Sequence, residues 1–295
     1  MMPALGGTVV CCRDVSAKAV YGAIGDHGVT HFGGARFGVR YDEGTETKIT
    51  NRFTINVDGT AETDSGVEFF GRVRIRGGNE GNGTTTNSGI SAPRVGARMG
   101  GLTIATGNIN GAIDSLPGVY SGSVGLTGLG YSNVVAGGSF DGFSSNGGGV
   151  NGVEVIYSAN GLGVHLSDSG VTDRTALGLS YAFGDWTVAM GIQDGLTAAE
   201  NFTILTANGS VGSVSLGLML SDNDDDTGGV RINAGFEVGA GTNVTVFIAD
   251  RDTAGADTAY GLGFTHSLGG ATLAGGIASD AAGATHADLG VRFNF

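Results

Sequence analysis

The chain has 295 residues, of which 58 are glycine and 3 are proline, and only 15% are charged. The glycines follow no Gly-X-Y period, which excludes a collagen-like chain, and the two cysteines are adjacent, which excludes a disulfide-stapled fold. The formal net charge is −13, and such an acidic total argues against nucleic acid as a partner.

Alternation of apolar and polar residues is the dominant pattern from residue 30 onward. In the run 48–57, for example, Ile49, Phe53 and Ile55 share one face and polar residues take the other. A period of two is the signature of a β-strand with two different faces. The pattern predicts sixteen strands, near 30–42, 48–59, 66–77, 90–99, 102–107, 150–159, 162–168, 175–183, 186–193, 202–208, 211–221, 229–239, 243–251, 257–267, 271–279 and 285–295.

The number and length of these strands favour one membrane architecture. An even number of segments, each of about ten residues, with tight turns alternating with longer loops, is typical of a transmembrane β-barrel. A soluble sandwich also alternates, but side chains could not fill the lumen of a soluble barrel of this size. We therefore predict an all-β fold, a sixteen-stranded antiparallel transmembrane β-barrel over residues 30–295.

Basic residues are concentrated in the first third of the predicted barrel. Nine of the fifteen lysines and arginines lie between Arg36 and Arg98. An arginine that faces lipid at mid-depth costs about 2–4 kcal/mol, so these side chains are expected to face a wet interior. Parity places on one inner wall Arg36, Arg40, Arg52, Arg72, Arg74, Arg76, Arg94 and Arg98, with Lys48 on the same face. We call the eight arginines the basic wall and expect them to filter solutes electrostatically.

The stretch 107–149 breaks the alternation. It is rich in glycine, serine and asparagine, yet it is too apolar for a solvated surface loop. A connection of this length in a compact domain usually has a function. We expect it to fold into the lumen and narrow it; the alternatives are an extracellular loop or a contact with a neighbouring subunit. Its acids, Asp114 and Asp141, are the candidates to face the basic wall.

Three stretches carry residues with a resemblance to a known family. They are 34–41 (Gly-Ala-Arg-Phe-Gly-Val-Arg-Tyr), 63–69 (Thr-Asp-Ser-Gly-Val-Glu-Phe) and 287–295 (Ala-Asp-Leu-Gly-Val-Arg-Phe-Asn-Phe). Over about residues 30–295 the chain resembles general porins of Gram-negative outer membranes, of the Rhodobacter type found in alphaproteobacteria. Its ending resembles the signal read by the barrel assembly machinery, with Phe295, Phe293 and Val291 at alternate positions.

The resemblance implies an integral outer-membrane homotrimer that forms a water-filled channel for passive diffusion of ions and small hydrophilic solutes. Its other implied partners are outer-membrane lipid, lipopolysaccharide and the assembly machinery. In the family's constriction, arginines of the wall face acids on the third loop. By position these are Arg36, Arg52, Arg72, Arg74 and Arg94 on the wall, and Asp114 and Asp141 on the loop.

The chain departs from the family pattern because this loop has few acids. A strong field across the constriction is therefore not expected, and the basic wall predicts passage that weakly favours anions, set against an acidic exterior that would enrich cations at the mouths. The alternative function is a barrel of the same fold that is plugged or specific for one solute.

Residues 1–29 do not read as a signal peptide. No basic residue precedes their short apolar stretch, and no small residue precedes Cys11 or Cys12 as lipid attachment requires. We expect this segment to be a leader remnant or a misassigned start, and we assign it no fold.

Two further features of the sequence bear on calcium binding and on catalysis. The acidic run 222–226 offers Asp222, Asp224 and Asp226 as candidate calcium ligands, but Thr227 and Asn233 stand where the helix-loop-helix calcium motif needs glycine and glutamate. A solvated acidic loop is the favoured interpretation, and no cofactor is required. No Gly-x-Ser-x-Gly motif lies near a histidine, so we expect a protein without catalytic activity.

Overall fold

The computed structural model describes residues 19–20, 27–79, 86–130 and 139–295. Most of the predicted N-terminal segment 1–29 therefore lies outside the described residues. The first long strand begins at His27, three residues before the predicted start of the barrel. No helix in the described ranges is long and apolar enough to cross a membrane.

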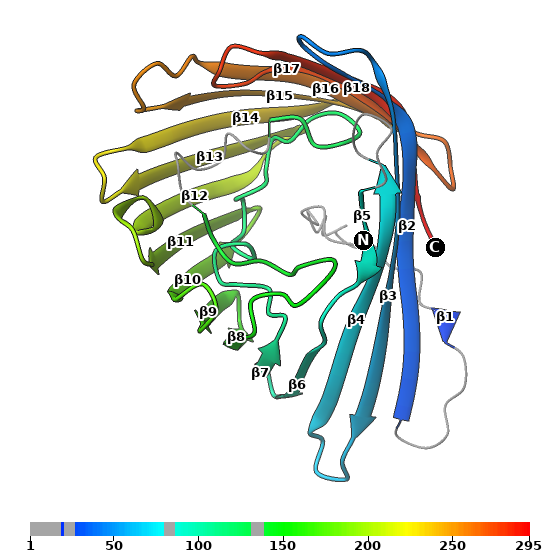
Figure 1. The fold of residues 1–295 in the computed structure, drawn as a ribbon, viewed down its shortest axis with the longest axis vertical. Coiled ribbons are helices and arrows are strands. Elements are labelled where there is room, and N and C mark those ends of the chain that lie inside the picture. Colours follow the sequence, from blue (N-terminus) through cyan, green and yellow to red (C-terminus); the bar gives the residue numbers. More distant parts are fainter. Residues whose placement is uncertain (1–18, 21–26, 80–85, 131–138) are drawn as a thin grey trace, which may run out of the picture.

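The chain forms a closed antiparallel sheet whose strands follow one another in chain order (Figure 1). Within the described residues the sheet has eighteen segments. They are β1 (Ala19–Val20), β2 (His27–Asp42), β3 (Lys48–Glu62), β4 (Glu68–Asn79), β5 (Thr86–Ile90), β6 (Arg94–Met99), β7 (Leu102–Gly107), β8 (Gly152–Ala159), β9 (Leu162–Ser169), β10 (Arg174–Phe183), β11 (Trp186–Asp194), β12 (Phe202–Val211), β13 (Val214–Asn223), β14 (Gly228–Gly239), β15 (Thr242–Arg251), β16 (Ala259–Ser267), β17 (Thr272–Ser279) and β18 (Thr285–Asn294).

The barrel itself has sixteen strand positions, as predicted. The two-residue β1 only flanks β2, and β5 and β6 both pair with β4 and so share one position. The sequence predicted a single strand over 90–99 here, which was wrong. Pro93 has no N–H to donate. The Ser91 N–H still bonds to Arg74 of β4, but the Ala92 N–H and the Ile90 carbonyl bond to Gly147 of the long loop.

The barrel closes where its last strand meets its first. β18 pairs with β2 from His286↔Asp42 to Asn294↔Gly34, and beyond this register Phe295 and Gly33 exchange backbone hydrogen bonds of 2.8 and 3.0 Å. The Phe295 ring stacks on Phe53 of β3 at 5.3 Å between centroids. We call this β2–β18 pairing the closure seam.

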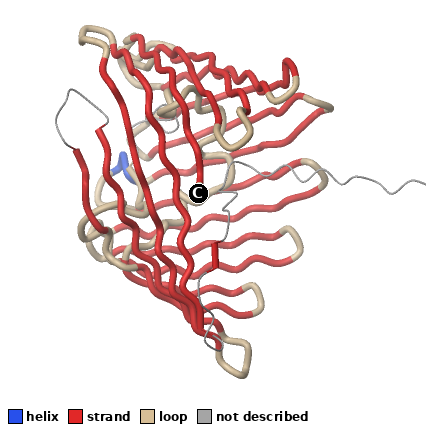
Figure 2. The backbone as a smooth tube through the Cα atoms, turned by 90° about the vertical axis from the view of Figure 1, so that its right-hand side faces the viewer, coloured by secondary structure: helices blue, strands red, loops and turns tan. Residues whose placement is uncertain are grey.

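Short hairpins join the strands at one end of the barrel, such as those at 160–161, 184–185 and 212–213 (Figure 2). We call this the turn end, and the opposite end, where the longer connections lie, the loop end.

The two faces of the sheet are inverted relative to a soluble protein. On β13, Leu218 and Leu220 point outward and are 37% and 41% exposed, while Met219 between them points inward and is 1% exposed. The same alternation runs around the barrel, and its outward residues are large and apolar. Such an apolar outer face fits contact with lipid, while the inner face is free to be polar.

The seam stacking predicts a stability effect for Phe295→Ala. Loss of the aromatic pair with Phe53 should remove about 1 kcal/mol at the place where the barrel closes. The measurement is the temperature at which the refolded barrel loses compact migration on a detergent gel. Phe183→Ala is the matched control, because Phe183 also stacks outward, on Tyr181 at 6.0 Å, but within a hairpin away from the seam. An equal drop in this temperature for both variants would show that the seam pair stabilises the barrel no more than an aromatic pair elsewhere.

Candidate functional site

The connection after β7 turns into the barrel instead of projecting from it (Figure 1). Its first limb packs against the inner faces of β10 to β13. Ile113, Leu116 and Val119 are 5% exposed or less and form one buried cluster with strand residues such as Ile204 and Met219. An inward-folded loop was predicted, and the burial of these apolar side chains against the inner wall confirms it.

Small residues on the inner wall make room for this limb. A Cβ placed on Gly191 of β11 would lie 2.7 Å from the Ile113 side chain, and one on Gly178 of β10 would lie 3.2 Å from Leu116. Contacts under 3.0 Å do not occur without movement, so a larger residue at Gly191 would force at least the Ile113 side chain of the loop to shift. Glycine at these strand positions therefore leaves space for the loop side chains to pack against the wall.

The tip of the loop is a short hairpin, residues 124–129, which crosses to the seam side of the barrel. Val124 and Leu129 exchange backbone hydrogen bonds of 3.2 and 2.8 Å and are buried with Phe247 and Ala259. The wall beneath is again glycine. It consists of Gly38, Gly263, Gly276 and Gly290, where an added Cβ would come within 3.0 Å of loop atoms.

Asp288 of β18 holds the tip by its carboxylate. The carboxylate accepts hydrogen bonds from the amides of Leu126 (2.8 Å) and Thr127 (2.7 Å) and from the Thr127 hydroxyl (2.6 Å), and Asp288 is only 6% exposed. From β2, Arg36 donates to the Leu126 carbonyl at 3.3 Å and Arg40 to the Thr127 hydroxyl at 3.4 Å. Two members of the predicted basic wall thus hold the loop tip.

Arg231 of β14 lies buried beneath the middle of the loop. It is 1% exposed, and its Nη2 donates to the Gly118 carbonyl at 2.8 Å and to the Ser121 hydroxyl at 3.1 Å. Sequence reasoning missed this role. The available signal was that Arg231 is one of only four basic residues after residue 100 and stands at an inward position of its strand.

The returning limb is tied to β10 by Asp141. Its carboxylate accepts from Arg174 at 3.1 Å and from the Thr172 hydroxyl at 2.8 Å, and Arg174 also pairs with Glu200. Asp141, predicted to face the basic wall, therefore acts as an attachment point of the loop. The other predicted acid, Asp114, accepts a hydrogen bond from the Tyr120 hydroxyl within the loop.

The root of the loop is held by a buried carboxylate that the sequence analysis did not single out. Glu154 of β8 is fully buried and pairs with Arg94 of β6. It also lies 2.9 Å from the His165 ring and accepts from the Asn110 amide at 3.3 Å. The signal for it was an acid at an inward position of the predicted strand 150–159.

The basic wall occupies inward positions of β2, β3, β4 and β6, as parity predicted. Cross-strand register brings Arg36 opposite Arg52, and Arg72 opposite Arg94. Several members have acidic partners: Arg40 and Lys48 pair with Asp42, Arg72 with Asp58, Arg94 with Glu154 and Arg98 with Glu68.

At mid-height, Arg74 and Arg76 bond to neutral groups. Arg74 donates to Asn56 at 2.8 Å and to Ser145 of the returning limb at 3.2 Å, and Arg76 donates to Thr54 at 3.2 Å. Both side chains are partly exposed. Like Arg36 at the loop tip, these two arginines of the wall donate to neutral oxygens, and they do so near the middle of β4.

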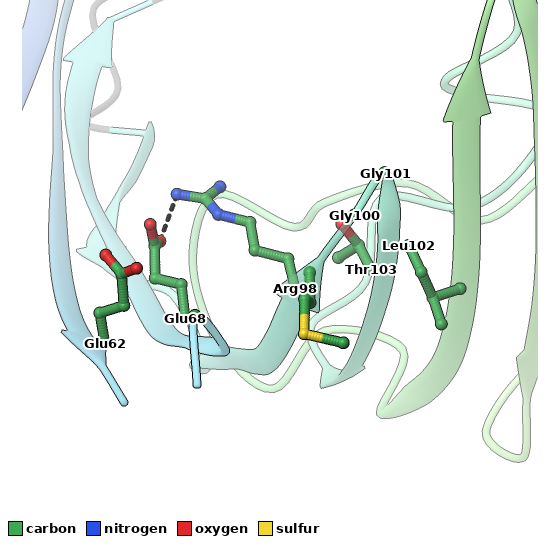
Figure 3. Close-up of a pocket in the computed structure, with 9 residues that line it drawn as sticks. Glu62, Glu68, Arg98, Gly100, Gly101, Leu102 and Thr103 are labelled. Atoms are coloured by element: carbon green, nitrogen blue, oxygen red, sulfur yellow. Dashed lines mark hydrogen bonds and ion pairs between the residues drawn. The ribbon is translucent and has the colours of Figure 1, made fainter. Parts of the chain in front are cut away.

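A separate pocket of about 290 Å³ lies at the turn end of β3, β4, β6 and β7 (Figure 3). Glu62, Glu68, Arg98 and Leu102 line it, and Arg98 points toward Glu68. It lies away from the loop and is not part of the constriction.

The candidate calcium ligands lie at the loop end. Asp222 is near the end of β13, and Asp224 and Asp226 lie in the connection to β14. Across the described residues, no group of three or more His, Cys, Asp or Glu side chains is close enough to hold a metal ion. The geometry therefore gives the calcium site no support.

At the loop end, a histidine and two aspartates join the two strands of the closure seam. The His286 ring of β18 lies 2.8 Å from Asp42 of β2 and 3.0 Å from Asp280 of the preceding connection. Amides of Ala282 and Ala284 also donate to Asp280, at 2.9 and 3.0 Å.

Comparisons with known proteins agree with this architecture. The family described as Gram-negative porin matches residues 8–285. A porin of Fuscovulum blasticum is 32% identical over 303 residues, covering 89% of this chain and 98% of that protein. Solved structures of two substituted variants of the Rhodopseudomonas blastica porin superpose with TM-scores of 0.82 and 0.81, each at 27% identity and covering 90% of this chain and all of theirs.

The hold of Asp288 on the loop tip is open to direct test. Asp288→Ala removes three hydrogen bonds to one carboxylate, each worth about 1.5–3 kcal/mol, so the tip should detach and move. We expect noisier single-channel current and faster protease cleavage within 122–130. Asp194→Ala, an exposed aspartate at the loop end of β11, is the control and should match the wild type. A quiet channel in Asp288→Ala would mean that the apolar seat alone holds the tip.

The Asp280 cluster predicts acid sensitivity of the 280–284 connection. Burial raises the pKa of the Asp280 carboxyl, but hydrogen bonds from His286 and from the Ala284 and Ala282 amides outweigh burial and hold that pKa below its ordinary value. A lowered folded-state pKa adds stability above the unfolded pKa, and this stability is lost as pH falls through the folded value, below about 4.

Amide hydrogen exchange of residues 280–286 should therefore accelerate as the pH drops through this window, after correction for intrinsic exchange. In Asp280→Asn the local protection should already be reduced at neutral pH and should change little with acid. The same acid response in wild type and variant would exclude Asp280 as its source.

Proposed function

The chain belongs to the Gram-negative porins, integral outer-membrane channels for passive diffusion, and from that premise we propose that its loop and basic wall form a weakly anion-favouring constriction. The observation that supports this best is the placement of the loop. It is seated mainly on β10 to β18, and the arginines of β3 and β4 form the opposite side of the lumen, where the returning limb reaches Arg74. Solutes that cross the barrel pass between these two sides.

The sign of the selectivity follows from where the acids lie. Asp141 is bound to Arg174 and Asp288 to the loop tip, so both carboxylates are engaged in holding the loop. The wall carries closely spaced guanidinium groups, since Arg36 faces Arg52 and Arg72 faces Arg94 across neighbouring strands. A positive potential at the narrow level would raise the local concentration of anions, while the acidic loop end would draw cations to that mouth.

The proposal includes the partners that the family resemblance implies. We propose a homotrimer, embedded in outer-membrane lipid and lipopolysaccharide and inserted by the barrel assembly machinery through its aromatic ending at Phe295. It needs no cofactor and no catalytic step, because the wall and loop residues act by charge and size alone. A barrel that is plugged or restricted to one solute is the alternative.

Planar-bilayer recordings of the refolded protein test the proposal. We expect ohmic steps that close in threes. Under a KCl gradient, the sign of the reversal potential should show a modest preference for chloride over potassium. Steps too small to resolve from a correctly folded barrel would favour the plugged alternative.

Charge removal on the wall should shift the selectivity. In the double variant Arg74→Gln and Arg76→Gln the reversal potential should move toward cation preference, with an anion-to-cation permeability ratio lower by about twofold or more. Arg251→Gln, at the loop end of β15, is the control of equal charge type. A wild-type channel with clear cation selectivity would contradict the proposal, as would a double variant with unchanged selectivity.

A further inference from the structure

Aromatic rings accompany the arginines down the inner wall. The guanidinium of Arg72 lies 5.0 Å from the centre of the Phe32 ring, and that of Arg74 lies 4.6 Å from the Phe143 ring. Nearer the turn end, Arg94 and Arg98 lie 5.1 and 5.5 Å from the ring of Phe70. A guanidinium within about 6 Å of a ring face is attracted by the ring quadrupole, so each pair is a favourable contact.

The pair at Arg74 joins the two sides of the constriction. Phe143 belongs to the returning limb of the loop, whereas Arg74 belongs to β4 of the wall. The limb is fixed at this level, because Asn108 and Ser144 exchange hydrogen bonds of 2.7 and 2.9 Å and Ser145 accepts from Arg74. The ring therefore has a defined position against the arginine.

The loop presents a further ring to the lumen. Tyr120 is 42% exposed, and its hydroxyl group is held by Asp114. The Phe143 side chain is also only half-buried. Tyr120 packs against Phe140 with 6.5 Å between ring centres and Phe143 against Arg74, and part of the surface of both Tyr120 and Phe143 stays exposed. The narrow level of this pore thus combines planar cations with planar apolar surfaces.

Resting on the proposed function, we propose that this constriction selects small planar anions. Among the solutes that enter the pore, it binds aromatic carboxylates most tightly. A carboxylate is attracted by the guanidinium groups of the wall, and an aromatic body stacks on a ring beside them. Saturated acids keep the charge but lose the stacking, and neutral aromatic solutes keep the stacking but lose the charge. Only a solute with both features uses both surfaces.

Single-channel recording at about 0.1 M KCl, where charge interactions are weakly screened, tests this inference. Benzoate, cyclohexanecarboxylate and benzyl alcohol serve as probes, added to one side at equal millimolar concentrations. Benzoate should reduce the KCl current at a concentration at least threefold lower than cyclohexanecarboxylate, and benzyl alcohol should have the least effect. Equal block by the two acids would overturn the proposal, because charge would then explain the whole effect.

Two variants assign the effect to the Arg74–Phe143 pair. Phe143→Leu keeps apolar bulk and loses the ring, so the preference for benzoate should fall to near unity. Phe140→Leu, three residues earlier on the same limb, is the matched control, because Phe140 packs against the buried loop cluster. Arg74→Lys keeps the charge and loses the planar guanidinium that packs on the Phe143 ring, and it should weaken block by benzoate more than block by cyclohexanecarboxylate.

The outcomes separate this inference from the proposed function. KCl steps from the wild type establish the pore, and their absence would refute the pore itself. With steps present, a benzoate preference that survives in Phe143→Leu and Arg74→Lys would overturn the assignment. If Phe143→Leu alters the KCl conductance through a moved loop, the Arg74→Lys comparison decides.

Discussion

Every backbone N–H and C=O at membrane depth must find a partner within the protein, and the rest of this structure depends on that requirement. The strands meet it by closing the sheet on itself at the β2–β18 pairing, which joins the two strands that an open sheet would leave as edges. Closure by sixteen strand positions leaves a lumen too wide for side chains to fill. The lumen is occupied by the chain itself, through the loop that follows β7.

A loop that packs against the inside of a barrel restricts the size of the side chains on the wall beneath it. The loop packs closely where many wall side chains are small, and glycine and alanine line the inner faces beneath it, as at Gly191 and Gly290, beside larger apolar residues such as Ile204. A high glycine content suits the curvature and tilt of a barrel sheet. The structure adds a second cause, since many inward glycines are positions where a Cβ would collide with the loop. The opposite wall carries the long arginine side chains, some of which, such as Arg36 and Arg74, reach across to the loop.

The strands were largely predictable because period-two alternation is a local signal, and a one-residue error would turn every side chain to the wrong face. The inward direction of the basic wall followed from the same parity. The partners of single charges were not predictable, because they depend on contacts between residues far apart in the chain. Asp141 meets Arg174, and Asp288 meets Leu126 and Thr127, only once the loop has folded into the barrel.

The fully buried Glu154 illustrates the same limit, since its neighbours come from β6, β9 and the start of the loop. Likewise, the break at Pro93 could have been suspected from proline, but the bond that replaces the missing ladder comes from Gly147 of the returning limb.

The loop tip has a consequence for how the barrel is assembled. It bonds to Asp288 of the last strand and to Arg36 and Arg40 of the first, so it bridges from inside the two strands that must find each other for the cylinder to close. A segment that narrows the finished pore thereby also acts as an internal brace across its joint. Shortening the loop to widen the channel would remove that brace as well, so changes of pore size in this barrel are coupled to the ease with which its two terminal strands come together.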